Sequence, residues 1–447
     1  MLRLRDGQAV LWEELLPAEV RLLSPELQAV DALLDDERFL APFVERFWCP
    51  IGRPTIPIES YLRLMYLKHR YSLGYETLCK EVTDSLSWRR FARIRLDARA
   101  PHPTTLMKLT RRFGPEVVDE LNRALLERAV ADKLLRSRRL RVDTTAVEAD
   151  VRHPTDSGLC AHAVSRMSRA VEQVKDAGLA RRTPYRDRRR SAGKAVRRLS
   201  AARGRGGNSR PAVDRLTGEL HALAKSAARQ ARRVLANANR ALGTGVRQGG
   251  AQAARLAHEL EGAGRVIAQT AARLAGQRTI PDRMVSLSDR DARPIRRGRP
   301  LKPTEFGYKA SIADSPEGFV VSHQLYAGNP NDAHTLEEAV RAAQRVGMRV
   351  TTVLADRGYG NEVGDQALGR CGISDSVIPR AGRAAPIQHT RGWRRRYRFR
   401  AGAEGRISAL KRGRGWTRSR LKGYAGARIW TGLGVFTHNL DRMAALG

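Results

Sequence analysis

Four residues near the C-terminal end of the chain have the types and spacing of a chemical site. Tyr397, Arg400, Glu404 and Lys411 form the pattern Y-x2-R-x3-E-x6-K. Each residue of an α-helix advances about 100°, so this spacing predicts one helix with all four side chains on one face. The carboxylate can bind a divalent cation, the two cations can hold phosphate oxygens, and the phenol can stack on a base. The pattern therefore indicates chemistry at a phosphodiester.

Two aspartates upstream are candidates to complete a metal site with Glu404. Asp143 lies in a segment, 140–149, whose alternation and β-branched residues predict a strand. Asp356 directly follows 349–355, an apolar run that predicts a buried strand. Taken singly, either aspartate is also compatible with an edge or turn position, and Glu404 with an ordinary ion pair to Arg400 on a helix surface.

The charge balance narrows the class of partner. The 447 residues contain 82 Lys and Arg against 46 Asp and Glu, a formal charge of +36. A chain this basic favours a polyanionic partner, with nucleic acid first among them. No apolar run approaches the length of a membrane span, and the start of the chain lacks an apolar signal core. We expect a cytoplasmic protein.

The cysteines do not indicate a metal or disulfide site. The chain has four, Cys49, Cys79, Cys160 and Cys371, and no C-x-x-C pair. Zinc sites and disulfide frameworks both need cysteines at recurring spacings. We interpret the four as ordinary thiols.

The N-terminal 135 residues are predicted to be helical. Apolar residues follow helical spacing from Ile58 to His69, Gly74 interrupts the pattern, and a further helix follows Pro101 with Thr104 as its expected N-cap. That helix is expected to face Leu106, Leu109 and Phe113 inward and Lys108, Arg111 and Arg112 outward. Its basic face fits either a helix-turn-helix-like DNA reader or a plain helical bundle with a solvated surface.

Residues 160–280 form a basic, alanine-rich insert. Two series with steps of three and four residues predict an antiparallel helical hairpin, one from Leu216 to Leu242 and one that runs Leu256, Leu260, Ala263, Ile267, Ala271, Leu274. The stretch 181–210 carries twelve Arg or Lys and a single acid, Asp187. The insert fits a structural spacer, a coiled-coil dimer contact or an arm that grips DNA, and we favour DNA contact because the charge exceeds what solubility requires.

From residue 281 onward, strand patterns return. Strands are expected at 283–288, 306–313 and 318–326 as an antiparallel meander. A helix at 336–346, the strand that precedes Asp356, a second helix, a short strand near Val377 and the helix that carries Glu404 follow. This order predicts a mixed α/β sheet.

Several of these motifs together resemble the DDE transposases of bacterial insertion sequences. The similar segments are Asp143-Thr-Thr, His153-Pro-Thr-Asp-Ser-Gly, Gly328-Asn-Pro-Asn-Asp, Ala355-Asp-Arg-Gly-Tyr-Gly and the Tyr397/Arg400/Glu404/Lys411 signature. The likeness runs from about residue 57 to the end, and within the family it is greatest to elements with the Y-R-E-K signature and a helical insert in the catalytic domain.

The resemblance implies an RNase H-like core with Asp143, Asp356 and Glu404 as metal ligands for two Mg²⁺ ions, or Mn²⁺ in their place. It also implies binding to the terminal inverted repeats of the element, cleavage there and joining of the 3′ ends to target DNA. Two ends must be held together, so a homodimer on double-stranded DNA is expected. The implied organisation is a helical DNA-end-binding domain at 1–135, a core in two parts at 136–159 and 281–447, and the insert at 160–280 between them.

Two other functions fit the same sequence. One is a transposase-derived DNA-binding protein without catalytic activity, and the other is a simple RNase H-like nuclease without strand transfer. Intact acids weigh against the first, and the insert and the N-terminal helices weigh against the second. The spare acids include Glu148 and Asp150, whereas Asp156 and Asp332 are interpreted as turn residues that can also support the metal ligands from outside.

Overall fold

The computed structural model describes residues 1–6, 17, 22–47, 51–204, 210–244, 248–296, 303–380, 388 and 390–447. Cys49, part of the arginine-rich stretch near residue 205 and part of the turn before Gly250 lie outside these ranges. The chain divides into two compact units. The first contains residues 1–150 and 307–447, and the second contains residues 151–306.

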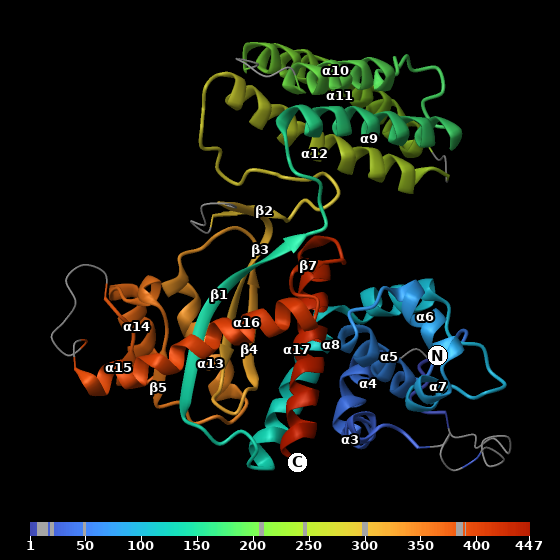
Figure 1. Cartoon of the computed structure of the whole chain (residues 1–447). Helices are drawn as coiled ribbons and strands as arrows, with labels where there is room; N and C mark the ends of the chain where they lie inside the picture. The colour runs from blue at the N-terminus through green and yellow to red at the C-terminus, as the bar shows by residue number, and fades with distance from the viewer. Residues whose placement is uncertain are drawn as a thin grey trace. The chain divides into compact units, whose positions relative to one another are not determined.

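The N-terminal part of the first unit is helical, as the sequence predicts. Its helices are α3 (Pro25–Leu34), α4 (Ala41–Arg46), α5 (Ile58–Arg70), α6 (Tyr75–Asp84), α7 (Leu86–Phe91) and α8 (Pro103–Ala131) (Figure 1). Gly74 is the N-cap of α6. The expected N-cap Thr104 is wrong, because His102 takes this position and its Nδ1 accepts a hydrogen bond from the Thr104 amide at 3.3 Å. Pro103 can then open the helix without losing an amide bond.

Helix α8 connects these helices to the rest of the first unit. It changes direction at Gly114, whose φ of 77° is outside the helical range, next to Pro115. Beyond the kink it packs on α17 (Gly423–Leu446), where the Asn122 side chain donates to the Gly432 carbonyl at 3.0 Å. One hydrophobic core runs from Leu27 through α8 and α17 to the sheet.

The sheet of the first unit is mixed and is built around β1 (Arg139–Ala149). This strand pairs antiparallel with β3 (Thr304–Asp314) and parallel with β5 (Thr352–Leu354), which pairs in parallel with β6 (Asp375–Val377). On the other side, β3 pairs antiparallel with β4 (Val320–Tyr326), and β7 (Arg418–Ser419) joins the end of β1. The helices α13 (Leu336–Arg345), α14 (Glu362–Arg370), α15 (Arg391–Arg398) and α16 (Gly402–Gly413) complete the unit. The predicted mixed α/β fold is confirmed.

Three details differ from the sequence prediction. The expected strand at 283–288 is absent, because the Gln269 side chain bonds both the amide and the carbonyl of Met284 and takes the place of a partner strand. The short strand near Val377 begins two residues earlier, at Asp375. The chain also continues beyond Glu404 into α17, a long helix that the sequence reading did not separate.

The second unit is a helical bundle. It contains α9 (Asp156–Asp176), α10 (Arg189–Gly204), α11 (Arg210–Gly243) and α12 (Gly250–Leu274), followed by the short strand β2 (Arg293–Arg296) (Figure 1). The helices pack through alanines and small apolar residues. The predicted seam holds on α11 but shifts on α12, where Val266 and Thr270 are buried while Ala271 and Leu274 are exposed. Alanine is frequent on both faces of α12, so its pattern alone does not fix the register.

The β1–β3 pair leaves no room for a side chain at Gly307. A Cβ atom there would lie 2.1 Å from the Val147 carbonyl oxygen and 2.6 Å from the Ala149 amide nitrogen. We expect Gly307→Ala to lower the free energy of unfolding by about 2 to 4 kcal/mol, since strand backbone must move. Gly369→Ala on α14 is the control, because it meets open space and should be neutral or stabilising. Thermal unfolding followed by circular dichroism measures both, and equal stability of the two variants would contradict the pairing.

Candidate active site

Asp143 lies in the middle of the central strand of the sheet. Its side chain is 12% exposed, and its Oδ1 accepts a hydrogen bond from the Thr144 amide at 2.8 Å. The strand forms because apolar and β-branched residues on both sides of Asp143 are buried. Asp143 therefore has a fixed backbone, and its second carboxylate oxygen, Oδ2, lies 3.4 Å from Arg400 Nη2.

Asp356 follows β5, the parallel neighbour of β1. It is the N-cap of the 3-10 turn η3 (Arg357–Tyr359), where its Oδ1 accepts from the Gly358 amide at 2.8 Å. Because β1 and β5 are adjacent, the carboxylates of Asp143 and Asp356 face the same place on the sheet. A carboxylate at the end of a buried strand is the position that the sequence predicts.

Arg400 contacts the third acid, Glu404, as well as the two aspartates. Its Nη2 lies 3.4 Å from Asp143 Oδ2 and 3.8 Å from Asp356 Oδ2, and its Nη1 lies 3.5 Å from Glu404 Oε1. One guanidinium thus stands between three carboxylates. Its positive charge offsets the repulsion that the three negative charges would otherwise exert on one another. The ordinary ion pair expected as an alternative, Arg400 with Glu404, is therefore part of a larger cluster.

The four signature residues do not lie on one regular helix. Tyr397 belongs to α15, Arg400 to the 3-10 turn η5 (Phe399–Ala401), and Glu404 and Lys411 to α16. The tighter 3-10 turn changes the direction in which the following residues point. The expectation of one shared face is therefore wrong for Lys411, which lines a cavity that contains neither Arg400 nor Glu404. The Tyr397 ring stacks on Trp393 at 4.8 Å, and burial raises the pKa of the phenol although Arg400 opposes the shift.

Arg141 is a site residue that the sequence analysis missed. It lies on β1, is almost fully buried, and forms a two-pronged ion pair with Asp314 of β3. Its Nη1 also donates to the Phe399 carbonyl at 3.0 Å, and its guanidinium covers the Phe399 ring at 4.3 Å. A Cβ atom on Gly402 would lie 1.8 Å from Arg141 Nη1, so only glycine permits this approach. Arg141 thereby fixes the segment that carries Arg400 and Glu404.

A fourth acid, Asp332, lies next to the two aspartates. Its Oδ1 accepts from the Thr144 hydroxyl at 2.8 Å and pairs with Lys309 Nζ at 2.6 Å. Burial raises the pKa of the Tyr359 phenol well above its usual value, and Asp332, Asp143 and Asp356 add to the shift. The turn interpretation of Asp332 holds, since it opens a 3-10 turn, and its contacts also place it beside the candidate ligands. Asp156 instead opens α9 and pairs with Arg283.

The three basic residues expected to face outward on α8 do so. Lys108, Arg111 and Arg112 are exposed, while Leu106, Leu109 and Phe113 are buried. The Arg112 guanidinium covers the Phe47 ring at 4.4 Å. Within the described ranges, no hydrogen bond or ion pair joins these three cations to Asp143, Asp356 or Glu404.

The carboxylates have the chemistry of a site for a hard divalent cation. Asp143, Asp356 and Glu404 supply oxygen donors that Mg²⁺ prefers, all around one point of positive charge. In the described part of the chain, no three acidic, imidazole or thiol side chains stand close enough to form a metal centre as they are. The donor set therefore fits Mg²⁺, provided that Arg400 moves out of the space between the acids.

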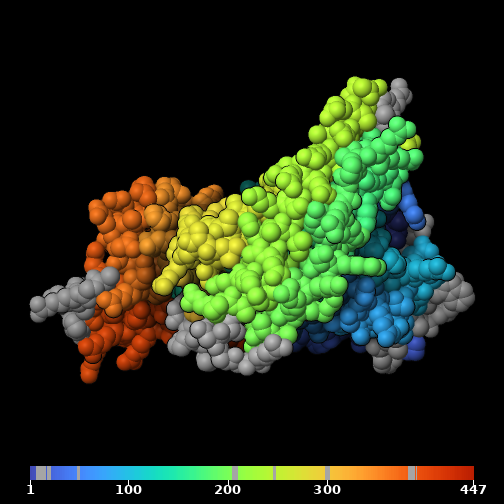
Figure 2. Space-filling model, turned by 90° about the horizontal axis from the view of Figure 1, so that it is seen from above, coloured from blue at the N-terminus to red at the C-terminus, as the bar shows by residue number. Residues whose placement is uncertain are grey.

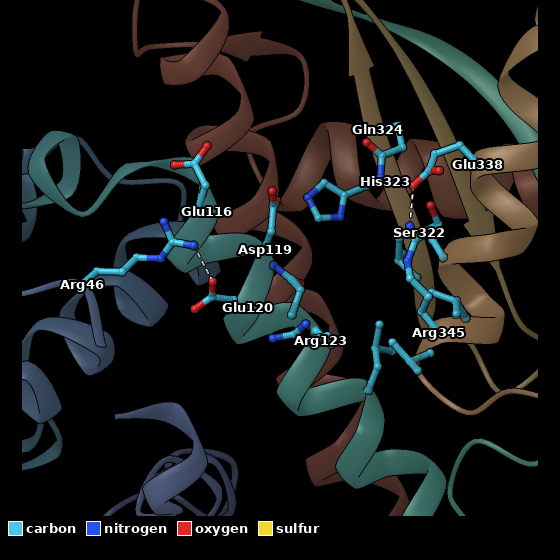
Figure 3. A pocket seen from close by; sticks show the side chains of 16 residues that line it. Arg46, Glu116, Asp119, Glu120, Arg123, Ser322, His323, Gln324, Glu338 and Arg345 are labelled. Carbon is cyan, nitrogen blue, oxygen red and sulfur yellow. Dashed lines mark hydrogen bonds and ion pairs between the residues drawn. The ribbon is translucent and has the colours of Figure 1, made fainter. Parts of the chain in front are cut away.

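A cavity of about 400 Å³ lies elsewhere, between α8 and the β4 side of the sheet (Figure 3). Its acids are already paired, Glu120 with Arg46 and Glu338 with Arg345. None of the three candidate metal ligands lines it. We therefore place the chemistry at the Arg400 cluster.

Comparison with known proteins finds two transposase families that match the chain. A family described as transposase domain (DUF772) matches residues 12–112, and one described as transposase DDE domain matches residues 286–440. The chain belongs to the DDE transposases. The second match contains Asp356 and Glu404, and the fold of this transposase is the mixed, RNase H-like sheet that the resemblance implies.

The transposase is also similar to a protein of Rhizobium meliloti named uncharacterized protein ORF8 in nfe locus. The two are 30% identical over 162 residues, which are 35% of this chain and 77% of the relative. No solved structure was found to match the chain. Among the described residues, no helix has the length and apolar character needed to cross a membrane.

Arg141 provides a test of how the transposase holds its site together. We expect Arg141→Met to destabilise the protein by up to about 3 kcal/mol, because it leaves the buried Asp314 carboxylate with Arg406 as its remaining ion-pair partner among the described residues. The double variant Arg141→Met/Asp314→Leu should recover part of that loss, since it also removes the partner of Arg406. Denaturant unfolding measures both effects. A loss below about 1 kcal/mol in the single variant would contradict the role of Arg141.

Proposed function

We propose that this transposase binds the terminal inverted repeats of an insertion sequence, cleaves the DNA at the ends of the element and joins the freed 3′ ends to target DNA. The observation that carries the proposal is the meeting of Asp143, Asp356 and Glu404 around Arg400. Clustered carboxylates are costly unless a cation shares them, and phosphodiester cleavage by two metal ions needs such a cluster.

Asp143, Asp356 and Glu404 would hold two Mg²⁺ ions, or Mn²⁺ in their place. When bound, these ions activate the attacking oxygen and stabilise the leaving oxygen of an in-line displacement. Asp143 would be suited to contact both ions, since its backbone lies in the rigid central strand. Glu404, 73% exposed on α16, closes the site from the side open to solvent.

The remaining signature residues position the DNA. Once the acids have metal partners, the Arg400 guanidinium is free to bind the phosphate beside the scissile bond. Tyr397, stacked on Trp393, offers an aromatic surface on which an unpaired base at the element end can stack. Lys411 lies at the far end of α16 and holds the strand farther from the cleaved bond. These roles are the ones expected of a transposase of the group with the Y-R-E-K signature.

The N-terminal helices would recognise the element end. Lys108, Arg111 and Arg112 form an exposed basic stretch at the start of α8, which follows a turn and two shorter helices. Such a helix can contact phosphates and base edges in a groove of DNA. Because two ends must be cut and joined together, the active form is a homodimer on DNA.

The helical insert would grip the DNA backbone. Arg190 and Arg197 on α10 and Arg229 and Arg232 on α11 are exposed and form no ion pair with a described residue. Figure 2 shows the face of the second unit on which α10 and α11 are exposed, in green to yellow-green. Unpaired arginines at this density favour a polyanion over a spacer role, because a spacer needs no excess charge.

Neutralising one acid at a time tests the cleavage proposal. We expect Asp143→Asn, Asp356→Asn and Glu404→Gln each to reduce Mg²⁺-dependent nicking at the terminal repeat by at least about a thousandfold, since each change removes a metal ligand. Binding to the repeat should persist. Glu362→Gln, an exposed acid outside the cluster, is the control.

The outcome separates the candidate functions. Binding without nicking in the wild type would favour a catalytically inactive DNA-binding protein. Nicking without joining would favour a simple nuclease. Full activity of any of the three variants would remove that acid from the site.

Salt dependence tests the insert. We expect the DNA affinity of the quadruple variant Arg190→Gln/Arg197→Gln/Arg229→Gln/Arg232→Gln to depend less steeply on salt concentration. The slope of log K against log[salt] should fall in magnitude by up to about 0.9 for each arginine that contacts a phosphate. The control removes four exposed arginines that already pair with acids: Arg123, Arg341, Arg345 and Arg370. Fluorescence anisotropy at several salt concentrations gives both slopes. Equal slopes for the two quadruple variants would support the spacer role.

A further inference from the structure

A second cavity of about 530 Å³ lies at the C-terminal end of α16. It is lined by cations from three places: Lys68 on α5, Lys411 and Arg412 on α16, and Arg418 and Arg420 near β7. Asp150 is the one acid in its lining, and it already pairs with Arg418 at 3.7 Å. The cavity therefore has an excess of positive charge and an aromatic wall formed by Trp430.

Lys68 is the unusual member of this cavity. Its side chain is 1% exposed, and its Nζ lies 4.0 Å from the centre of the Trp430 ring and 4.7 Å from that of Tyr75. Arg420 is a second cation close enough to disfavour its charge. Within the described residues Lys68 forms no ion pair with a carboxylate. A buried ammonium is normally paired, because an unpaired charge is costly to remove from water.

The arginines of the cavity differ in their partners. Arg412 and Arg420, which are exposed, form no ion pair with a described residue, whereas Arg418 pairs with Glu148 and Asp150. The glycine at position 415 has a φ of 75°, and a Cβ there would lie 3.0 Å from the Trp430 ring, so the chain bends closely around this wall. The cavity thus brings together more cations than acids, and its buried Lys68 has no ion pair with a described carboxylate.

We propose that this cavity, centred on Lys68, binds a phosphate of the DNA backbone on the strand that passes the candidate active site. The inference rests on the proposed function, since it assumes a DNA substrate. Trp430 and Tyr75 hold the ammonium in place from the apolar side, and the phosphate supplies the missing anion. Because Lys68 belongs to an N-terminal helix and Lys411 to the helix of Glu404, one phosphate would join the end-binding helices to the catalytic helix.

The distance along α16 is compatible with one DNA strand. Glu404 and Lys411 are seven residues apart, which corresponds to about 10 Å at about 1.5 Å per residue. Successive phosphates of one DNA strand lie farther apart than their rise of about 3.4 Å along the axis, because the strand winds around that axis. The cavity therefore lies within three nucleotides of the cleaved bond.

The charge state of Lys68 adds a pH signature. Burial, with a smaller effect of Arg420, lowers the pKa of Lys68 to about 7. His69, on the same helix and also buried, has its pKa lowered well below the usual value by burial and by Lys68, so it stays neutral. Lys68 is then neutral above about pH 7 and charged below it. Phosphate binding here should therefore strengthen as the pH falls from 8 to 6.

The experiment replaces single phosphates of the terminal-repeat duplex by uncharged methylphosphonates and measures affinity without Mg²⁺. In the wild type, a replacement at one of the three phosphates nearest the cleaved bond should weaken binding about tenfold, the usual effect of one charge-assisted contact. In Lys68→Met the same replacement should have no further effect. Lys80→Met on α6, an exposed lysine that does not line the cavity, should keep the wild-type response.

A second variant, at an exposed residue of the cavity, tests the site in case Lys68→Met alters folding. Arg420→Gln lies at the cavity rim and should also lose most of the response at the same phosphate. If wild-type protein does not prefer the terminal repeat at all, the proposed function fails before this inference is reached. If it binds the repeat but Lys68→Met responds to every methylphosphonate as the wild type does, the cavity is not a phosphate site and Lys68 is a neutral core residue.

Discussion

The site depends on one buried guanidinium, that of Arg141. It joins three segments that are far apart in sequence: β1 through its own backbone, β3 through Asp314, and the turn before α16 through the Phe399 carbonyl. Arg406 of α16 also reaches Asp314, at 3.3 Å, so the same buried carboxylate holds the helix at a second point. The turn at 399–401 is held at the same point, because the Phe399 carbonyl accepts from Arg141 Nη1 as well as from the Gly402 amide. Without that anchor, Glu404 would have no fixed position relative to the two aspartates.

The distribution of charge accounts for the rest of the first unit. Three carboxylates close together need a cation, and Arg400 supplies it in the protein alone, just as metal ions would in the proposed reaction. At the other end of the same helix positive charge is in excess, since five Lys and Arg side chains line the cavity with one acid, Asp150. One end of helix α16 thus lies at a cluster of carboxylates, and its other end lies at a cavity with excess positive charge. A metal-loaded phosphodiester substrate satisfies both.

The sequence predicted those features that depend on local residue patterns. Asp143 within a strand and Asp356 after one could be read from β-branched and apolar runs, and the family resemblance linked them to Glu404. Arg141 could not be found in this way, because 82 Lys and Arg make any single arginine uninformative and its partners are distant in sequence. The missing strand at 283–288 has the same cause, since a side chain from α12 occupies its hydrogen-bonding groups. Local sequence patterns predict strands and helices, whereas these two features depend on contacts between residues that are distant in sequence.

The central claim is that Asp143, Asp356 and Glu404 bind metal at one place. Fe²⁺ exchanged into a Mg²⁺ site generates hydroxyl radicals with ascorbate and peroxide, and these cut the backbone only close to the ion. Mapping the fragments of the wild-type chain therefore locates the site without any knowledge of the DNA end. The account predicts cuts near residues 143, 356 and 404, all suppressed by added Mg²⁺. Cuts confined to other segments, or cuts that Mg²⁺ does not suppress, would contradict it.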